Sequence, residues 1–108
     1  MYKLAPVVQE IFKKYVGDFE KKQVRFDLDF FDPTMKVASP SKVREALEFA
    51  VCDSLLRTRA RDAVEIKVSR DKIEIKDNAE KVFDGRETPD GLKARARVGV
   101  GTSFSIGL

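Results

Sequence analysis

An Asp-Asn pair in the second half of the sequence is the first candidate for binding chemistry. Asp77 and Asn78 follow an apolar, strand-like run and open a polar loop. A carboxylate at the end of a buried strand can accept a hydrogen bond from an amino group of a ligand in a pocket. Asp and Asn also form plain Asx turns, which are the commoner use of such a pair. The local sequence alone therefore favours a turn.

Two further segments carry residue types that bind ligands. Gly99, Gly101 and Thr102 lie in a short G-x-G-T run, where absent side chains let a ligand approach the backbone, although a glycine hairpin turn is commoner. Asp53 is spaced to fall at the edge of the apolar face of a helix. An acidic residue there predicts either a divalent-cation ligand or a solvated flank.

Basic residues form two groups: Arg57, Arg59 and Arg61 after a helix, and Lys93, Arg95 and Arg97 on alternate positions of a strand. Arginines at a helix C-terminus favour the helix dipole. On the strand we expect cross-strand ion pairs on an outward, solvated face, with Asp27, Asp29, Glu65 and Glu74. The aromatic residues fall on inward positions instead, which disfavours a nucleic-acid stacking surface. We therefore expect no nucleic-acid partner.

Composition excludes several classes of site. The chain has 108 residues, a size that predicts one domain (1–108), with 43% hydrophobic residues and a net charge of +3. It has one cysteine, Cys52, and no histidine, so it supplies no disulfide, Cys-His dyad or phosphorylatable histidine. No apolar run is long enough to span a membrane, and the first residues do not resemble a signal peptide. We expect a cytoplasmic protein without membrane contact; its scarce amides hint at a thermophilic source.

Hydrophobic periodicity predicts the elements that position these residues. Helical spacing over 4–19 and 40–58 predicts two amphipathic helices, the second starting at Ser39-Pro40. Alternation predicts strands at 23–30, 63–69, 71–76, 92–98 and 102–108, and 35–37 is expected as a short edge strand. In the strand at 92–98, the inward positions are Leu92, Ala94, Ala96 and Val98. The order of these helices and strands along the chain predicts an α+β, two-layer sandwich with two helices on one face of a mixed, mostly antiparallel sheet.

The collinear order of these segments resembles the catalytic and ATP-binding domain of sensor histidine kinases, in the GHKL (Bergerat-fold) superfamily. Residues 37–47 resemble the approach to the N box of that family. Residues 77–82 (DNAEKV) resemble its first glycine box, usually written DNGxGI, and residues 99–106 (GVGTSFSI) resemble its terminal G-x-G-T-x-F-x-I motif. The resemblance covers nearly the whole chain and implies a reduced form of that fold.

The resemblance also implies site roles and departures from them. Asp77 stands where the family recognises the adenine amino group; with Asn78, Gly99, Gly101 and Thr102 it forms the implied nucleotide-binding set. The two N-box asparagines, which serve magnesium and the phosphates, are replaced by Phe49 and Asp53, and the following lysine by Leu56. Two glycines of the first box are replaced by Ala79 and Lys81. The ATP lid, the glycine box after it and the helix they lead into have no counterpart.

Three functions follow as hypotheses. The leading one is a degenerate histidine-kinase-type domain, a pseudoenzyme acting as a non-catalytic signalling or interaction module of a two-component-like system. Its partner would be a response regulator, a kinase or a phosphotransfer protein. The alternative is a reduced but functional ATP/ADP-binding domain; of its cofactors Mg²⁺ is the less expected, and Asp53 is the residue that would hold it. The third is a small domain without a ligand, whose exposed sheet pairs with another chain.

Overall fold

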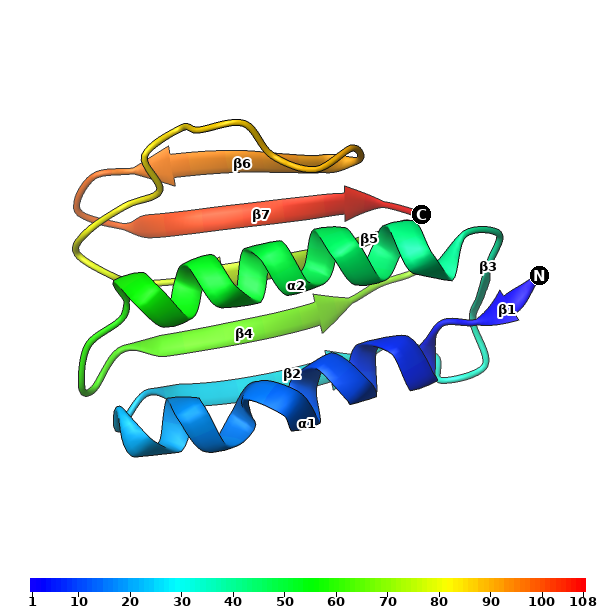
Figure 1. Cartoon of the computed structure of the whole chain (residues 1–108), viewed down its shortest axis with the longest axis horizontal. Helices are drawn as coiled ribbons and strands as arrows, with labels where there is room; N and C mark the ends of the chain where they lie inside the picture. Colours follow the sequence, from blue (N-terminus) through cyan, green and yellow to red (C-terminus); the bar gives the residue numbers. More distant parts are fainter.

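In the computed structural model, which describes residues 1–108, two helices cover one face of a five-stranded sheet (Figure 1). Helix α1 spans Ala5–Lys21 and α2 spans Pro40–Arg57. The strands lie in the order β2-β4-β5-β7-β6, with the bounds β2 Arg25–Phe30, β4 Ala63–Val68, β5 Lys72–Asp77, β6 Leu92–Arg97 and β7 Gly101–Gly107. Strand β2 is parallel to β4, and every other pairing is antiparallel. The predicted two-layer α+β architecture is confirmed.

The predicted edge strand at 35–37 does not join this sheet. Lys36–Val37 forms β3, which pairs antiparallel with β1 (Tyr2–Lys3) in a separate two-stranded ribbon before the helices. Strand β1 was not predicted, because two residues are too few to show an alternating pattern. The ribbon leaves β2 at one edge of the main sheet and β6 at the other.

The core lies between the helices and the sheet. On α1, the ring of Phe19 stacks on that of Phe26 of β2 at 4.2 Å between centroids, and Phe12 stacks on the same ring at 4.7 Å. On α2, Leu47 and Val51 are fully buried, as their helical spacing predicts. These contacts fix both helices on the sheet. They position the last turn of α2 over the C-terminal end of β5 and the start of β7. Neither helix is long and apolar enough to cross a membrane.

Strand β6 departs from the predicted burial. Leu92 is buried, but Ala94 and Ala96 are exposed, and Val98 is 88% exposed in the turn after the strand. The physical reason is the position of the helices: α1 runs along β2 and α2 crosses in front of β4 and β5, so that no helix lies over β6 (Figure 1). Alternation predicts which face Ala94 and Ala96 occupy, but no helix covers that face at β6.

The outer face of the sheet also differs from the prediction of cross-strand ion pairs. The ion pairs found there run along single strands: Arg25 with Asp27 on β2, and Glu74 with Lys72 and Lys76 on β5. The cations of β6 form none, because β7 sets Ser105, Ser103 and Gly101 opposite Lys93, Arg95 and Arg97. This edge of the sheet therefore carries unpaired positive charge.

We predict that Leu47→Ala lowers the free energy of unfolding by about 2–5 kcal/mol, because it leaves a cavity where a fully buried side chain stood. Leu56→Ala is the matched control on the same helix: Leu56 is 79% exposed, so its truncation should change stability by less than about 0.5 kcal/mol. Chemical denaturation measures both. Equal losses from the two variants would show that the buried face of α2 is wrongly assigned.

Candidate functional site

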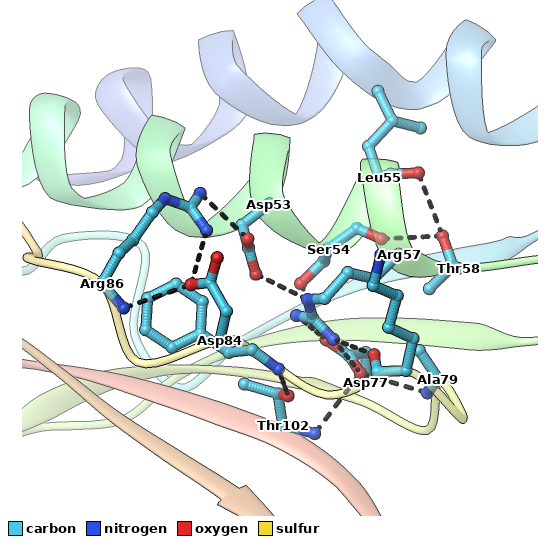
Figure 2. Close-up of polar contacts among 12 residues, drawn as sticks. Asp53, Ser54, Leu55, Arg57, Thr58, Asp77, Ala79, Asp84, Arg86 and Thr102 are labelled. Atoms are coloured by element: carbon cyan, nitrogen blue, oxygen red, sulfur yellow. Dashed lines mark hydrogen bonds and ion pairs between the residues drawn. The ribbon is translucent and has the colours of Figure 1, made fainter.

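The carboxylate of Asp77 lies at the end of β5, on the helix side of the sheet, and is almost fully buried. Figure 2 shows it surrounded by donors from three elements. Its Oδ2 accepts hydrogen bonds from Arg57 Nη2 at 2.7 Å and Ser54 Oγ at 2.9 Å. Its Oδ1 accepts from Arg57 Nη1 at 3.2 Å, and from the backbone N–H groups of Ala79 at 3.1 Å and Thr102 at 3.4 Å. Both oxygens are therefore engaged by the protein itself.

The guanidinium of Arg57, from the last turn of α2, bridges two buried carboxylates. Besides its paired bonds to Asp77, it donates from Nε to Asp53 Oδ2 at 2.7 Å and from Nη1 to the carbonyl of Lys81 at 3.1 Å. Burial opposes the charged form of Arg57, but the hydrogen bonds to Asp77 and Asp53 outweigh it and raise the pKa of the guanidinium above its usual value. Arg57 is thus held as a cation between two anions.

A second arginine closes the other side of Asp53. Arg86, from the loop between β5 and β6, places Nη2 at 3.0 Å from Asp53 Oδ1. Its guanidinium also lies 5.0 Å from the ring centroids of both Phe49 and Phe83, within cation–π range (Figure 2 shows it facing Asp53). Phe83 in turn packs edge-on against Phe104 of β7 at 5.2 Å. Aromatic rings and ion pairs therefore fill the region beside Asp53.

Asp53 was expected either to bind a divalent cation or to lie on a solvated flank. The solvated flank is wrong, since Asp53 is 3% exposed. Its two oxygens contact two guanidinium groups, and nowhere in the chain do three or more metal-ligating side chains gather. A magnesium ion at Asp53 would have to displace at least one arginine.

The other residues of the implied nucleotide set lie in different surroundings. Thr102 adjoins Asp77, and its Oγ1 accepts a hydrogen bond from the N–H of Phe83 at 3.0 Å. Asn78 closes the end of the β4–β5 hairpin: its Oδ1 accepts from the N–H of Ala63 at 2.8 Å. Gly99 lies in the exposed turn between β6 and β7 with a φ of 84°. Asp77, Gly101 and Thr102 are brought together, whereas Gly99 lies in a turn and Asn78 bonds to the start of β4.

Gly101 is required by the fold at a close approach of two backbones. Its φ is 135°, and a Cβ built there would lie 1.9 Å from the carbonyl oxygen of Asp77. No side chain fits in that space without moving the backbone. The glycine therefore lets β7 start directly against the end of β5, which brings the Thr102 N–H within reach of the Asp77 carboxylate.

Sequence reasoning missed Arg57, Ser54 and Arg86 as members of this cluster. Arg57 was interpreted only through the helix dipole, yet it lies four residues after Asp53 and forms an i, i+4 ion pair with it. That spacing was the available signal. The contacts to Asp77 and Arg86 join segments distant in sequence, and no local pattern encodes them.

We predict that Arg57→Met lowers the free energy of unfolding by about 3–5 kcal/mol, because it leaves the buried carboxylate of Asp77 without a cation and Asp53 with Arg86 alone. Arg59→Met is the matched control two residues later, where the side chain is exposed, and it should cost less than about 0.5 kcal/mol. Urea denaturation of both variants is the measurement. A loss for Arg57→Met no larger than for its control would contradict the buried bridge.

We also predict that Gly101→Ala destabilises the protein by more than about 2 kcal/mol, because the methyl group clashes with the carbonyl of Asp77 in a backbone conformation that disfavours side chains. Gly107→Ala, at the other end of β7, has open space around the new methyl group and should be nearly neutral. Thermal melts followed by circular dichroism compare the two. Similar melting temperatures would rule out the close approach at Gly101.

Comparison of the sequence with protein-family models and with curated proteins found no match. The fold, in contrast, is similar to several solved histidine kinases. The cytoplasmic segment of histidine kinase QseC matches with a TM-score of 0.76 and 9% identity, over 97% of this chain and 74% of that one. The catalytic domain of histidine kinase ThkA matches with a TM-score of 0.73 and 12% identity, over 99% and 93%.

A blue-light-activated histidine kinase of Erythrobacter litoralis gives the same result through its kinase domain, with a TM-score of 0.74 and 13% identity, over 98% of this chain and 64% of that one. At these identities the likeness establishes the fold and not the chemistry. The resemblance noted in the sequence is confirmed at that level: the chain has the fold of histidine kinase catalytic domains.

Proposed function

We propose that this chain is a non-catalytic interaction domain with a histidine kinase fold, whose adenine site is filled by its own side chains. The observation that carries the proposal is the paired hydrogen bonding of the Arg57 guanidinium to the carboxylate of Asp77. In the family that the sequence resembles, the aspartate at this position binds the amino group of adenine. Here an arginine of the same chain takes that place.

Energetic magnitudes favour the arginine over a nucleotide base. Breaking a buried ion pair by removing one partner costs about 3–5 kcal/mol. A hydrogen bond from a neutral amino group returns about 1 kcal/mol, or up to about 3 kcal/mol when the acceptor is charged. An adenine ring would also have to enter against the packed rings of Phe49, Phe83 and Phe104. Exchange of Arg57 for adenine is therefore unfavourable unless other contacts compensate.

The residues that would face the phosphates of a nucleotide offer few contacts to compensate for the loss of the Arg57 ion pair. Phosphates bind to exposed backbone N–H groups that glycines present, and Ala79 and Lys81 stand where the family has glycines. Asp53, the N-box position closest to a magnesium ligand, is held by Arg57 and Arg86. Moreover, every buried polar side-chain atom of the protein already has a hydrogen-bond partner, so that none is left waiting for a ligand. These features support a domain that is complete without nucleotide.

The histidine kinase fold supports a partner within a two-component system. Response regulators, kinases and phosphotransfer proteins contact domains of this type in the family that the sequence resembles. These 108 residues contain no histidine, so a phosphorylated histidine would have to lie outside them. The proposal places the domain in the cytoplasm, in keeping with the cytoplasmic segment of QseC that shares its fold.

One observation favours a second candidate, a reduced ATP/ADP-binding domain. Asp77, Gly101 and Thr102 of the implied nucleotide set do meet at one place. If the Arg57 side chain rotates toward solvent, the space beside Asp77, Gly101 and Thr102 opens. In this candidate the guanidinium acts as a gate, and nucleotide binding is coupled to its departure.

Isothermal titration with ATP, ADP and adenosine, each with and without Mg²⁺, separates the two candidates. We predict dissociation constants no tighter than about 1 mM, alike within about tenfold for the three compounds, because any residual affinity lies in the adenine end alone. Magnesium should not change them. Circular dichroism verifies that the titrated protein is folded.

Magnesium-dependent binding of ATP in the micromolar range would overturn the proposal. If Asp77→Asn then abolished that binding while Glu80→Gln, an exposed residue of the following loop, left it unchanged, the reduced nucleotide-binding domain would replace the interaction domain.

A further inference from the structure

Strand β6 is an edge of the sheet, beside which the preceding loop passes (Figure 1). Along one side it pairs with β7 over its full length, from Leu92 opposite Ile106 to Arg97 opposite Gly101. Along the other side its hydrogen-bonded contacts with the preceding loop are confined to Leu92. The N–H of Leu92 donates to the carbonyl of Pro89 at 3.1 Å, and its carbonyl accepts from Thr88 Oγ1 at 2.9 Å.

These two bonds fix which backbone groups of β6 are open. In an antiparallel pair, alternate residues direct both backbone groups toward the neighbouring strand or both away from it. Since both groups of Leu92 point away from β7, those of Ala94 and Ala96 do so too. No partner meets them. The edge therefore presents two N–H and two C=O groups in the spacing that another strand requires.

The helix-side face of this edge is also open. A groove of about 500 Å³ lies between β6 and the preceding loop, with Leu92, Ala94 and Ala96 along the strand and Phe83, Gly85, Arg86 and Thr88 on the loop side. No helix covers it in Figure 1. The small alanine side chains leave room for apolar side chains of an added strand on this face.

Charge identifies the kind of strand that fits. On the opposite face of β6, Lys93, Arg95 and Arg97 lie beside serine and glycine of β7 and form no ion pair. A strand added at this edge would set its own outward side chains about 5 Å from these cations. Carboxylates at alternate positions would each meet a cation there, and small apolar residues between them would face the groove.

A second copy of the chain fits this edge poorly. Pairing β6 with β6 would bring the basic side chains of both copies together on one face. Strand β2 does carry Asp27 and Asp29, but α1 runs along it (Figure 1). Phe12 and Phe19 of α1 stack on Phe26 of that strand. The flank of α1 lies beside that edge and leaves less room for a neighbouring sheet.

We propose that β6 accepts an acidic, extended segment of a partner protein as an additional edge strand. The open backbone groups of Ala94 and Ala96 would supply the hydrogen bonds, and Lys93, Arg95 and Arg97 would select acidic residues at alternate positions. The inference rests on the proposed function, because it assigns a surface to the partner of the interaction domain. Its test needs no nucleotide and involves no residue of the Asp77 cluster.

The probe is a fluorescein-labelled octapeptide of alternating aspartate and valine, titrated by fluorescence anisotropy against the full chain. We expect saturable binding below about 1 mM that weakens as salt increases, since exposed charges contribute to it. The same peptide with lysine in place of aspartate should not bind. Absence of saturable binding by folded wild-type protein would overturn the proposal.

Two pairs of variants separate strand addition from simple charge attraction. Ala96→Pro removes the outward N–H without removing a bond to β7, and should weaken binding at least about tenfold, whereas Ala96→Ser keeps the N–H and should bind as wild type does. Arg95→Glu should also weaken binding. Lys67→Glu, the same charge change on the outer face of β4, should not. If peptide binding were lost with Arg95→Glu but not with Ala96→Pro, the peptide would bind to a charged patch, and strand addition would be rejected.

Hydrogen exchange of backbone amides locates the bound peptide and does not depend on any variant. In the free protein the amides of Lys93 and Arg95, which face β7, should exchange slowly, and those of Ala94 and Ala96 quickly. A saturating concentration of the peptide should slow the amide exchange of Ala94 and Ala96 by at least about tenfold. If the peptide protected only amides outside β6, the proposed site would be refuted. Sedimentation of the free protein completes the test: a dimer disrupted by Ala96→Pro would make a second copy the occupant and overturn the assignment to a partner protein.

Discussion

The buried ion pair between Arg57 and Asp77 is the interaction on which the arrangement of the site depends. It joins the last turn of α2 to the end of β5, and through the Thr102 N–H it reaches the start of β7. Two charges removed from water need such complete hydrogen bonding to be tolerated. Ser54, Asp53 and the close backbone approach at Gly101 provide it. The helix, the two strands and the loop that meet there are held by one connected set of polar contacts.

In the function that we propose, this constraint links a filled ligand site to a surface for a partner. In the resembling family, a nucleotide, a lid and a following helix occupy the region beyond Asp77. Here Arg57, Phe83 and Arg86 fill the part next to Asp77, and a loop without a helix leads into β6. The space beside Asp77 is thereby filled from inside, while no helix covers the edge strand that follows. A domain built in this way is suited to contact another protein through β6.

The sequence predicted the fold well because the fold depends on local periodicity. The helical spacing of Leu47 and Val51 and the alternation along β2, β4 and β5 each identify an element and its buried face. It failed at Ala94 and Ala96, because alternation tells which face a residue occupies but not whether another layer covers that face. In the site, the resemblance to the first glycine box identifies Asp77 as a candidate, but nothing in the sequence identifies its partner Arg57. That contact joins residues of two elements, and tertiary packing alone brings them together.

The state of the Arg57 side chain tests the central claim most directly, and nitrogen NMR of the guanidinium measures it. If Arg57 fills the adenine site, its Nε–H proton exchanges slowly with water, its C–N rotation is restricted, and both stay unchanged when ADP and Mg²⁺ are added to about 1 mM. An exposed arginine such as Arg59 shows fast exchange in the same spectrum. Fast exchange at Arg57 in the free protein, or release of its guanidinium upon addition of ADP, would contradict a site closed by its own arginine.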